Sequence, residues 1–234
     1  MQAADSAVAQ LEHRSRSLPE HAELARVEAE RASTASDLVA AETEVSDLEL
    51  EQERAESDLE PVRQRLVRNE QRIAAGSVPD PKALSSMVEE VAHLRRRIGV
   101  LEDAELEVME RLEEATAARD ALRNRVEALT ADVGSVRQRR DEQLRALGQQ
   151  LDAQRQVRSG LVPQLPPDLL ALYTKIGATR GGVGAAELRQ RRCTGCQLEI
   201  NAAELREFAA AAPEEVLRCE ECGRILVRTA ESGL

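Results

Sequence analysis

The sequence predicts a mainly α protein, in which a long antiparallel coiled-coil hairpin precedes a small C-terminal zinc ribbon with four cysteine ligands. Three observations lead to this fold class. Apolar residues recur every seven positions over most of residues 1–158, which is the spacing of a coiled-coil seam. Aromatic residues make up only 1% of the 234 residues, too few for the core of an ordinary compact domain. All four cysteines lie after residue 192, in two Cys-x-x-Cys pairs.

The first long helix is predicted before residue 75. With Leu24 at heptad position a, positions a and d are mostly apolar to the end of this helix. Leu11 and Leu18 are out of phase with Leu24, and Pro19 lies where the phase changes. Because proline removes a backbone donor, the pattern predicts a hinge or a helix break near residues 17–20.

A turn is predicted at residues 76–80, where Gly76 and two prolines interrupt the heptads. Asp80 can cap the following helix, and Pro81 suits its first position. A second heptad repeat then begins at Leu84. A connection this short makes the two helices antiparallel and pairs residue i with roughly residue 155 − i. Residues 1–158 are therefore predicted to form one hairpin.

Residues 159–234 are predicted to contain a linker, a short helix and the zinc-ribbon domain. Several prolines between residues 159 and 167 indicate the linker, and Asp168 is expected to cap a helix over residues 169–176. Residues 201–212 predict a small helix, and the alternating residues 224–228 predict a short strand.

The two cysteine pairs carry the strongest chemical signal. Two thiolates two residues apart can reach one metal ion, and two such pairs complete a tetrahedron with zinc–sulfur distances of about 2.3 Å. Gly195 and Gly223 are expected to supply the permissive backbone of these turns. Four thiolates leave no open position, so the prediction is one structural Zn²⁺; redox chemistry of one pair and a rubredoxin-like iron site are the alternatives. The predicted ligands are Cys193, Cys196, Cys219 and Cys222.

Six arginines surround the cysteine pairs and are candidates for nucleic-acid binding, because they could contact phosphates. They are Arg189, Arg191, Arg192, Arg218, Arg224 and Arg228. The alternatives are a protein contact, or compensation of the negative charge of a zinc–tetrathiolate centre with Glu220 and Glu221 beside it. Only Tyr173 and Phe208 could stack on bases, which disfavours recognition of single strands.

Charge and hydropathy exclude several classes of function. Residues 1–158 carry 23 basic and 33 acidic side chains, so we do not expect a hairpin that coats nucleic acid. No run of 18 apolar residues predicts a membrane span, and the N-terminus lacks the pattern of a signal peptide. We expect a cytoplasmic protein with thiols rather than disulfides. No nucleophile–base pair, open metal site or carboxylate pair predicts an enzyme or a small-molecule substrate.

Short motifs of a known family lie along nearly the whole chain. They are Leu18-Pro19-Glu20, Val78-Pro79-Asp80-Pro81-Lys82, Leu101-Glu102-Asp103, Leu172-Tyr173 with Gly181-Gly182-Val183-Gly184, and Cys222-Gly223-Arg224-Ile225-Leu226. On these residues the chain resembles the bacterial C4-type zinc-ribbon proteins with a long coiled-coil hairpin. The resemblance implies a structural zinc on the four cysteines and a non-enzymatic role tied to transcription or RNA. Some members of that family are associated with the alternative sigma-54 factor and with messenger RNA.

The sequence therefore predicts a non-enzymatic, zinc-binding adaptor. Its hairpin is expected to contact a protein partner, such as the transcription machinery, and its ribbon to bind RNA, DNA or a second protein. One alternative is an RNA polymerase-associated factor of the Gre or DksA type, although the predicted turn holds only Asp80 where those proteins carry paired acidic residues. The other is a purely protein–protein scaffold, since Leu50, Val67 and Val100 lie off the seam and could form a partner face.

Overall fold

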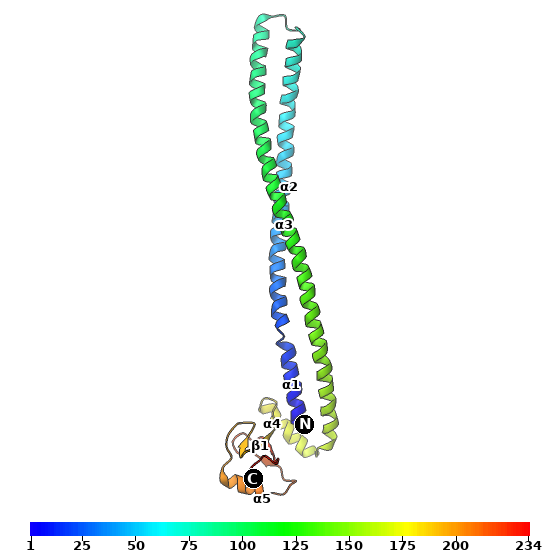
Figure 1. Ribbon diagram of the computed structural model, residues 1–234, viewed down its shortest axis with the longest axis vertical. Coiled ribbons are helices and arrows are strands. Elements are labelled where there is room, and N and C mark those ends of the chain that lie inside the picture. The colour runs from blue at the N-terminus through cyan, green and yellow to red at the C-terminus, as the bar shows by residue number, and fades with distance from the viewer. The chain divides into compact units, whose positions relative to one another are not determined.

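The computed structural model describes residues 1–234, most of which are helical (Figure 1). The long elements are α1 (Gln2–Arg16), α2 (Pro19–Ala74) and α3 (Pro81–Leu161). A single 3-10 turn (Val162–Gln164) and α4 (Pro167–Thr179) follow. The C-terminal elements are β1 (Ala185–Arg189), β2 (Arg192–Cys193), α5 (Ala202–Ala210), β3 (Leu217–Arg218) and β4 (Ile225–Val227). The mainly α fold with a helical hairpin and a small C-terminal strand region is confirmed.

The chain divides into two compact units. One is Met1–Ala22 together with Arg137–Leu234, and the other is Glu23–Val136. The predicted boundary between residues 158 and 159 falls inside the first unit, within α3. None of the helices combines the length and the apolar content needed to cross a membrane.

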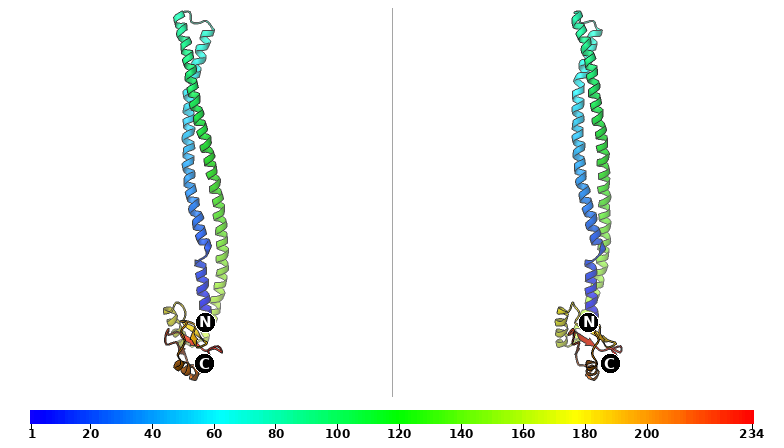
Figure 2. Two further views of the ribbon diagram at one scale, coloured as in Figure 1. Left: turned by 60° about the vertical axis from the view of Figure 1, so that its left-hand side comes forward. Right: turned by 90° about the vertical axis from the view of Figure 1, so that its left-hand side faces the viewer.

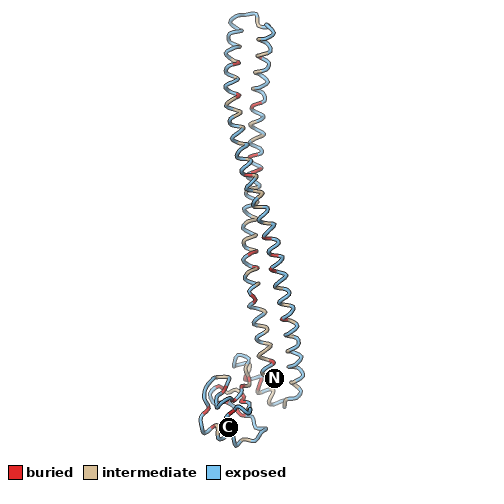
Figure 3. The backbone as a smooth tube through the Cα atoms, viewed as in Figure 1, coloured by how far each residue is buried: buried red, intermediate tan, exposed pale blue.

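In the unit Glu23–Val136, α2 and α3 form an antiparallel coiled coil whose helices lie side by side in every view (Figures 1 and 2). Its buried clusters are Leu24, Val27, Leu129, Val133 and Val136, and Val45, Leu48 and Ala115. All of these are positions a or d of the predicted heptads, and buried positions recur along the helices in Figure 3. Asn69, a polar residue at a d position, is also buried and its Nδ2 has no partner. A polar seam residue of this kind fixes the register at a cost in stability.

Ion pairs join the two helices along the flanks of this seam. Arg63 Nη2 lies 2.7 Å from Glu102 Oε1, and Arg95 Nη2 lies 2.6 Å from Glu70 Oε1. Arg65 pairs with Glu90 on the other flank, where the predicted 155 − i relation holds, whereas the first two pairs are offset from it by ten positions. The buried seam lies midway between the two flanks: Val45 and Leu48 pack with Ala115 and Leu112, so residue i lies opposite roughly residue 160 − i, five positions from the prediction.

The turn between α2 and α3 ends in the predicted helix cap. The two carboxylate oxygens of Asp80 accept hydrogen bonds of 3.2 Å from the backbone N–H groups of Lys82 and Ala83, and α3 begins at Pro81. Gly76 has a φ of +62°, which is the left-handed conformation that ends α2.

In the unit Met1–Ala22 with Arg137–Leu234, a polar network ties α1 and the end of α3 to α4. The Tyr173 hydroxyl donates to Asp5 Oδ2 at 2.5 Å and lies 3.0 Å from Gln2 Oε1. Arg158 Nε donates to Asp5 Oδ1 at 2.5 Å. Gln2 Oε1 also accepts the backbone N–H of Gly184 at 2.8 Å. The ribbon is thereby anchored to the base of the hairpin by half-buried polar groups as well as by apolar packing.

Two local details of this unit concern the ends of helices. α1 ends at Arg16 and α2 begins at Pro19, so the helix break predicted near residues 17–20 lies at Ser17 and Leu18. The expectation that Asp168 caps the short helix is wrong. α4 begins at Pro167 after Pro166, without a side-chain cap, because proline at the first turn needs no acceptor for a backbone N–H.

Replacing Tyr173 by phenylalanine should weaken this network. The variant removes the hydrogen bond that the Tyr173 hydroxyl donates to the Asp5 carboxylate, so we expect the free energy of unfolding to fall by about 1.5–3 kcal/mol. Burial, and then the hydrogen bond and charge of Asp5, raise the pKa of Tyr173. Its contribution is therefore complete below the ordinary pKa of about 10 and is lost as pH rises through the folded-state pKa.

Tyr173 is the only tyrosine of the chain, which has no tryptophan, so tyrosinate absorbance reports this group directly. The folded protein should ionise Tyr173 above pH 10, and the denatured chain near pH 10. Ionisation near pH 10 in the folded protein would contradict the buried network.

The ribbon is a four-stranded sheet with strand order β2-β1-β4-β3. β1 pairs antiparallel with β2 and parallel with β4, and β3 pairs antiparallel with β4. The strand predicted at 224–228 is present as β4, and the helix predicted at 201–212 is present as α5, capped by Asn201. β1 was not predicted, because its sequence Ala-Ala-Glu-Leu-Arg has low strand propensity.

Candidate metal centre and the surface of the zinc ribbon

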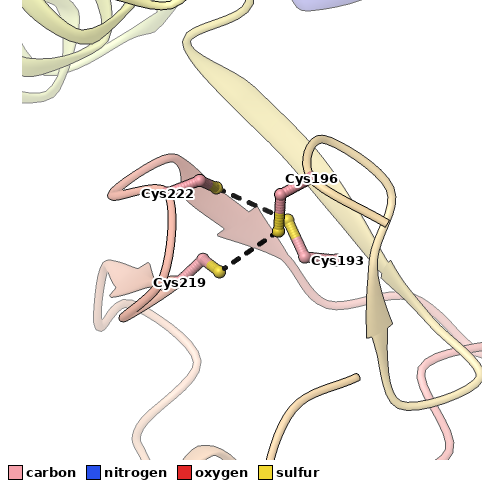
Figure 4. A group of neighbouring side chains, drawn as sticks. All are labelled: Cys193, Cys196, Cys219 and Cys222. Atoms are coloured by element: carbon pink, nitrogen blue, oxygen red, sulfur yellow. Dashed lines mark hydrogen bonds between the residues drawn. The ribbon is translucent and has the colours of Figure 1, made fainter. Parts of the chain in front are cut away.

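Four cysteine side chains from two turns of the ribbon point toward one another (Figure 4). Their sulfur atoms all lie within 4.8 Å of one another. Cys193 Sγ is 3.8 Å from Cys222 Sγ, and Cys196 Sγ is 3.9 Å from Cys219 Sγ. A tetrahedron with zinc–sulfur distances of about 2.3 Å has edges of about 3.8 Å, so these side chains fit one zinc ion.

The two cysteine turns share one backbone geometry. In each turn, the residue four positions after the first cysteine donates its N–H to that cysteine's carbonyl at 2.8 Å: Gln197 to Cys193, and Gly223 to Cys219. Both residues have a positive φ, +67° and +70°. The expectation for Gly223 therefore holds, but Gly195 does not have a positive φ. Gly195 instead provides space, because a Cβ there would lie 2.6 Å from Arg224 Cδ.

The ribbon core encloses the ligands. Cys193, Cys219 and Cys222 are buried, and Cys196 is half-buried. They pack in one cluster with Ala186, Leu188, Ile200, Phe208, Leu217 and Leu226. Sequence reasoning missed Ser232 of the C-terminal tail, which is buried and donates from Oγ to the carbonyl of Leu188 at 2.8 Å.

Burial and hydrogen bonds set the protonation of the metal-free thiols. Burial raises the pKa of Cys193, and it raises that of Cys219 to about 12. Burial also opposes ionisation of Cys222, but the backbone N–H and side chain of Arg224 and the neighbouring thiols outweigh it and lower the pKa to about 7. Zinc binding must therefore displace protons from buried thiols, and zinc affinity should rise with pH.

The six predicted arginines do not form one basic patch. Four of them donate from the side chain to backbone carbonyls, and three of these four serve as ties inside the ribbon. Arg224 contacts the carbonyls of Val183, Gly195 and Arg180 at 3.0–3.2 Å. Arg228 contacts those of Phe208, Ala211 and Ala212, and Arg218 that of Gly223.

The other three arginines come together at the β1–β2 turn. Arg189 and Arg192 are direct partners across the two strands, and Arg191 lies in the turn with a φ of +63°. All three are exposed. Arg189 pairs with Glu231 at 2.7 Å, and Arg192 lies 3.8 Å from Glu199. Arg191 donates to the carbonyl of Gly233 at 3.1 Å.

Comparison with known proteins agrees with this architecture. Residues 1–181 match the CT398-like coiled coil hairpin domain. The chain belongs to this family. Downstream of the CT398-like hairpin, residues 192–226 match the C4-type zinc ribbon domain. The chain therefore carries one structural Zn²⁺ on four cysteines.

Relatives of this CT398-like protein span nearly its whole length. The uncharacterised protein Rv2229c of Mycobacterium tuberculosis strain H37Rv is 37% identical over 224 residues, which cover 96% of this chain and 91% of that protein. A structure from Mycobacterium smegmatis has 34% identity and a TM-score of 0.82, covering 97% of this chain and 94% of that one. The structure of CT398 from Chlamydia trachomatis, at 16% identity and a TM-score of 0.66, shares the fold over 97% and 94% of the two chains.

Proposed function

We propose that the protein is a non-enzymatic, cytoplasmic adaptor of the transcription or RNA machinery, whose hairpin contacts a protein and whose ribbon contacts nucleic acid. The observation that carries this proposal is the closed metal centre. Four thiolates fill the coordination sphere of zinc, which leaves no position for a substrate or an activated water. The zinc therefore serves to hold the ribbon surface in shape.

The β1–β2 turn is the part of the ribbon suited to phosphate contacts. Arg189 and Arg192 form exposed ion pairs with Glu231 and Glu199, and exposed pairs of this kind contribute little to stability. Their guanidinium groups can exchange a carboxylate for a phosphate at small cost, because both anions fit the same planar donors. The carbonyl-bound arginines such as Arg224 are needed to keep the ribbon folded.

The middle of the hairpin is the part suited to a protein partner. Residues 42–60 of α2 and 102–114 of α3 together carry sixteen acidic and two basic side chains. Among them, Leu50, Leu106 and Met109 are 47%, 56% and 37% exposed. Exposed apolar residues within an acidic surface fit a basic amphipathic segment of a partner protein.

The Gre or DksA alternative receives no support at the hairpin turn. Asp80 lies at the turn, as predicted, but its carboxylate caps α3 by accepting two backbone hydrogen bonds. The turn therefore lacks the pair of free acidic side chains that this alternative requires.

The ribbon proposal is tested by binding of the zinc-loaded protein to a cellular RNA pool over a series of salt concentrations. The variant is Arg189→Gln with Arg192→Gln. The control is Arg54→Gln with Arg145→Gln, which removes the same charge from two exposed arginines elsewhere. The ribbon variant should reduce the slope of log K against log salt by about one for each phosphate that it no longer neutralises, whereas the control should not. Equal slopes in the wild type and the ribbon variant would refute the assignment.

A further inference from the structure

Positive charge is concentrated at the end of the hairpin that carries the turn. The hairpin tip, residues 61–101, has eight basic and four acidic side chains, although the whole chain has a net charge of −11. An acidic segment flanks the tip on each side in the sequence. These two segments, residues 42–60 and 102–114, form the acidic middle of the hairpin. The net charge of residues 1–158 as a whole conceals this reversal.

Three of the basic residues at the tip are used within the hairpin, in the ion pairs of Arg63, Arg65 and Arg95. The other five are exposed, and their side chains make no hydrogen bond or ion pair within the chain. These free side chains are Arg68, Arg72, Lys82, Arg96 and Arg97.

The free basic residues do not stabilise the hairpin. Neither Arg68 nor Arg72 has a carboxylate three or four residues away, and the two face each other at i and i+4, where like charges destabilise a helix. Lys82 lies in the first turn of α3, where the helix dipole disfavours a cation. Arg96 and Arg97 likewise lack a carboxylate at helical spacing. Their charges therefore fit an anion outside the chain.

Two of these arginines line a groove beside the turn. The groove has a volume of about 310 Å³ and is lined by Arg68, Gln71, Arg72, Ala75 and Ser77. Two guanidinium groups and an amide provide hydrogen-bond donors there, and no acidic side chain lines it. A phosphate group suits this donor set, because guanidinium groups bind phosphate with paired donors.

The same flank of the hairpin continues onto α3. Arg65 and Arg72 occupy heptad position g of α2, and Arg68 at position c lies next to them on the helix surface. Arg97 occupies position g of α3. The ion pair between Arg65 and Glu90, also a g position, shows that the g flanks of the two helices adjoin. Since each residue rises 1.5 Å, Arg65, Arg68 and Arg72 follow one another along α2 at steps of about 4.5 and 6 Å, and Arg97 lies about 10.5 Å along α3 from Glu90, the partner of Arg65.

We propose that the hairpin tip binds the sugar–phosphate backbone of double-stranded nucleic acid. A row of guanidinium groups fits a repeating polyanion, which carries a phosphate every 3.4 Å along each strand. The tip contains no phenylalanine, tyrosine or tryptophan, which disfavours binding of a single strand by stacking on its bases. The contact is therefore independent of base sequence, and it is separate from the ribbon surface.

The test measures binding of the full-length, zinc-loaded protein to a DNA duplex and an RNA duplex of one sequence over a salt series. The tip variants are Arg68→Gln with Arg72→Gln, and Arg96→Gln with Arg97→Gln. The control is again Arg54→Gln with Arg145→Gln, and circular dichroism verifies that each variant keeps its helices. On each duplex that the wild type binds, each tip variant should lower the slope of log K against log salt by about one for each phosphate that it no longer binds. The control should have the wild-type slope.

Several results would overturn the tip proposal. The first is a wild type that binds neither duplex at low salt, and the second is a pair of tip variants that both keep the wild-type salt slope. The third is that the tip variants bind the duplexes as the wild type does and lose binding only to vesicles of anionic lipid. Failure of the ribbon is distinguishable from failure of the tip. If the ribbon variant Arg189→Gln with Arg192→Gln binds as the wild type does and the tip variants do not, the ribbon assignment fails and the tip proposal stands.

Discussion

Removal of zinc is expected to unfold the ribbon, residues 185–227, and to leave the helices of the hairpin folded. The ribbon has short strands of two to five residues and a small core built around the cysteines. Structural zinc contributes about 10–16 kcal/mol of apparent binding free energy to domains of this kind. The hairpin has its own buried seam, such as Leu59 at 1% exposure and Leu129 at 2%, which no zinc ligand touches.

Hydrogen exchange and circular dichroism of the chelated protein measure this outcome. Amides of β1 and β4 should lose protection, whereas helical ellipticity should fall only by the share of α5 and neighbouring residues. Cys219→Ser should reproduce the effect of the chelator, and Arg192→Gln should retain full protection. If the ribbon amides stay protected from hydrogen exchange after complete removal of zinc, the apolar core alone is sufficient to keep the ribbon folded.

Replacing Arg224 by alanine is expected to weaken zinc binding by about 10–100-fold, although Arg224 is not a ligand. Its guanidinium joins the two cysteine turns and the α4–β1 loop, through the carbonyls of Gly195, Val183 and Arg180. Arg224 also lowers the pKa of Cys222, so the variant should require a higher pH to bind zinc. Competition with a chromophoric chelator at several pH values measures both effects.

Arg224→Lys should restore little of the affinity, because one ammonium group cannot reach three carbonyls with the geometry of a guanidinium. Arg189→Ala is the matched control, since that side chain forms only an exposed ion pair. Wild-type zinc affinity in Arg224→Ala would show that the cysteine turns hold their shape without this tie.

Long-range regularity explains which parts of the fold were predictable. The heptads phased on Leu24 and Leu84 identify the seam, because a seven-residue repeat can satisfy its apolar face only in a coiled coil. Short motifs were equally informative at Asp80 and at the cysteine pairs. The helix cap depends on residues next to Asp80, and each half of the metal site depends on two cysteines that are close together in the sequence.

Other features depend on contacts between distant residues, which single-sequence patterns do not contain. β1 exists because its parallel partner β4 lies beside it, despite a sequence that favours helix. The roles of the arginines were obscure for the same reason. Nothing local distinguishes Arg224, which holds three carbonyls, from Arg192, which reaches only an exposed glutamate. The excess of basic residues at the hairpin tip is visible in the sequence, but only when charge is counted over segments shorter than residues 1–158.

X-ray absorption at the zinc edge tests most directly whether the metal centre is closed, on which the non-enzymatic role depends. We predict a single shell of four sulfur atoms at about 2.3 Å, with no nitrogen or oxygen ligand. The spectrum should be unchanged in Arg189→Gln, whose side chain lies outside the ribbon core. A shell of three sulfurs and one oxygen would reveal an open position for water, and it would contradict a purely structural zinc.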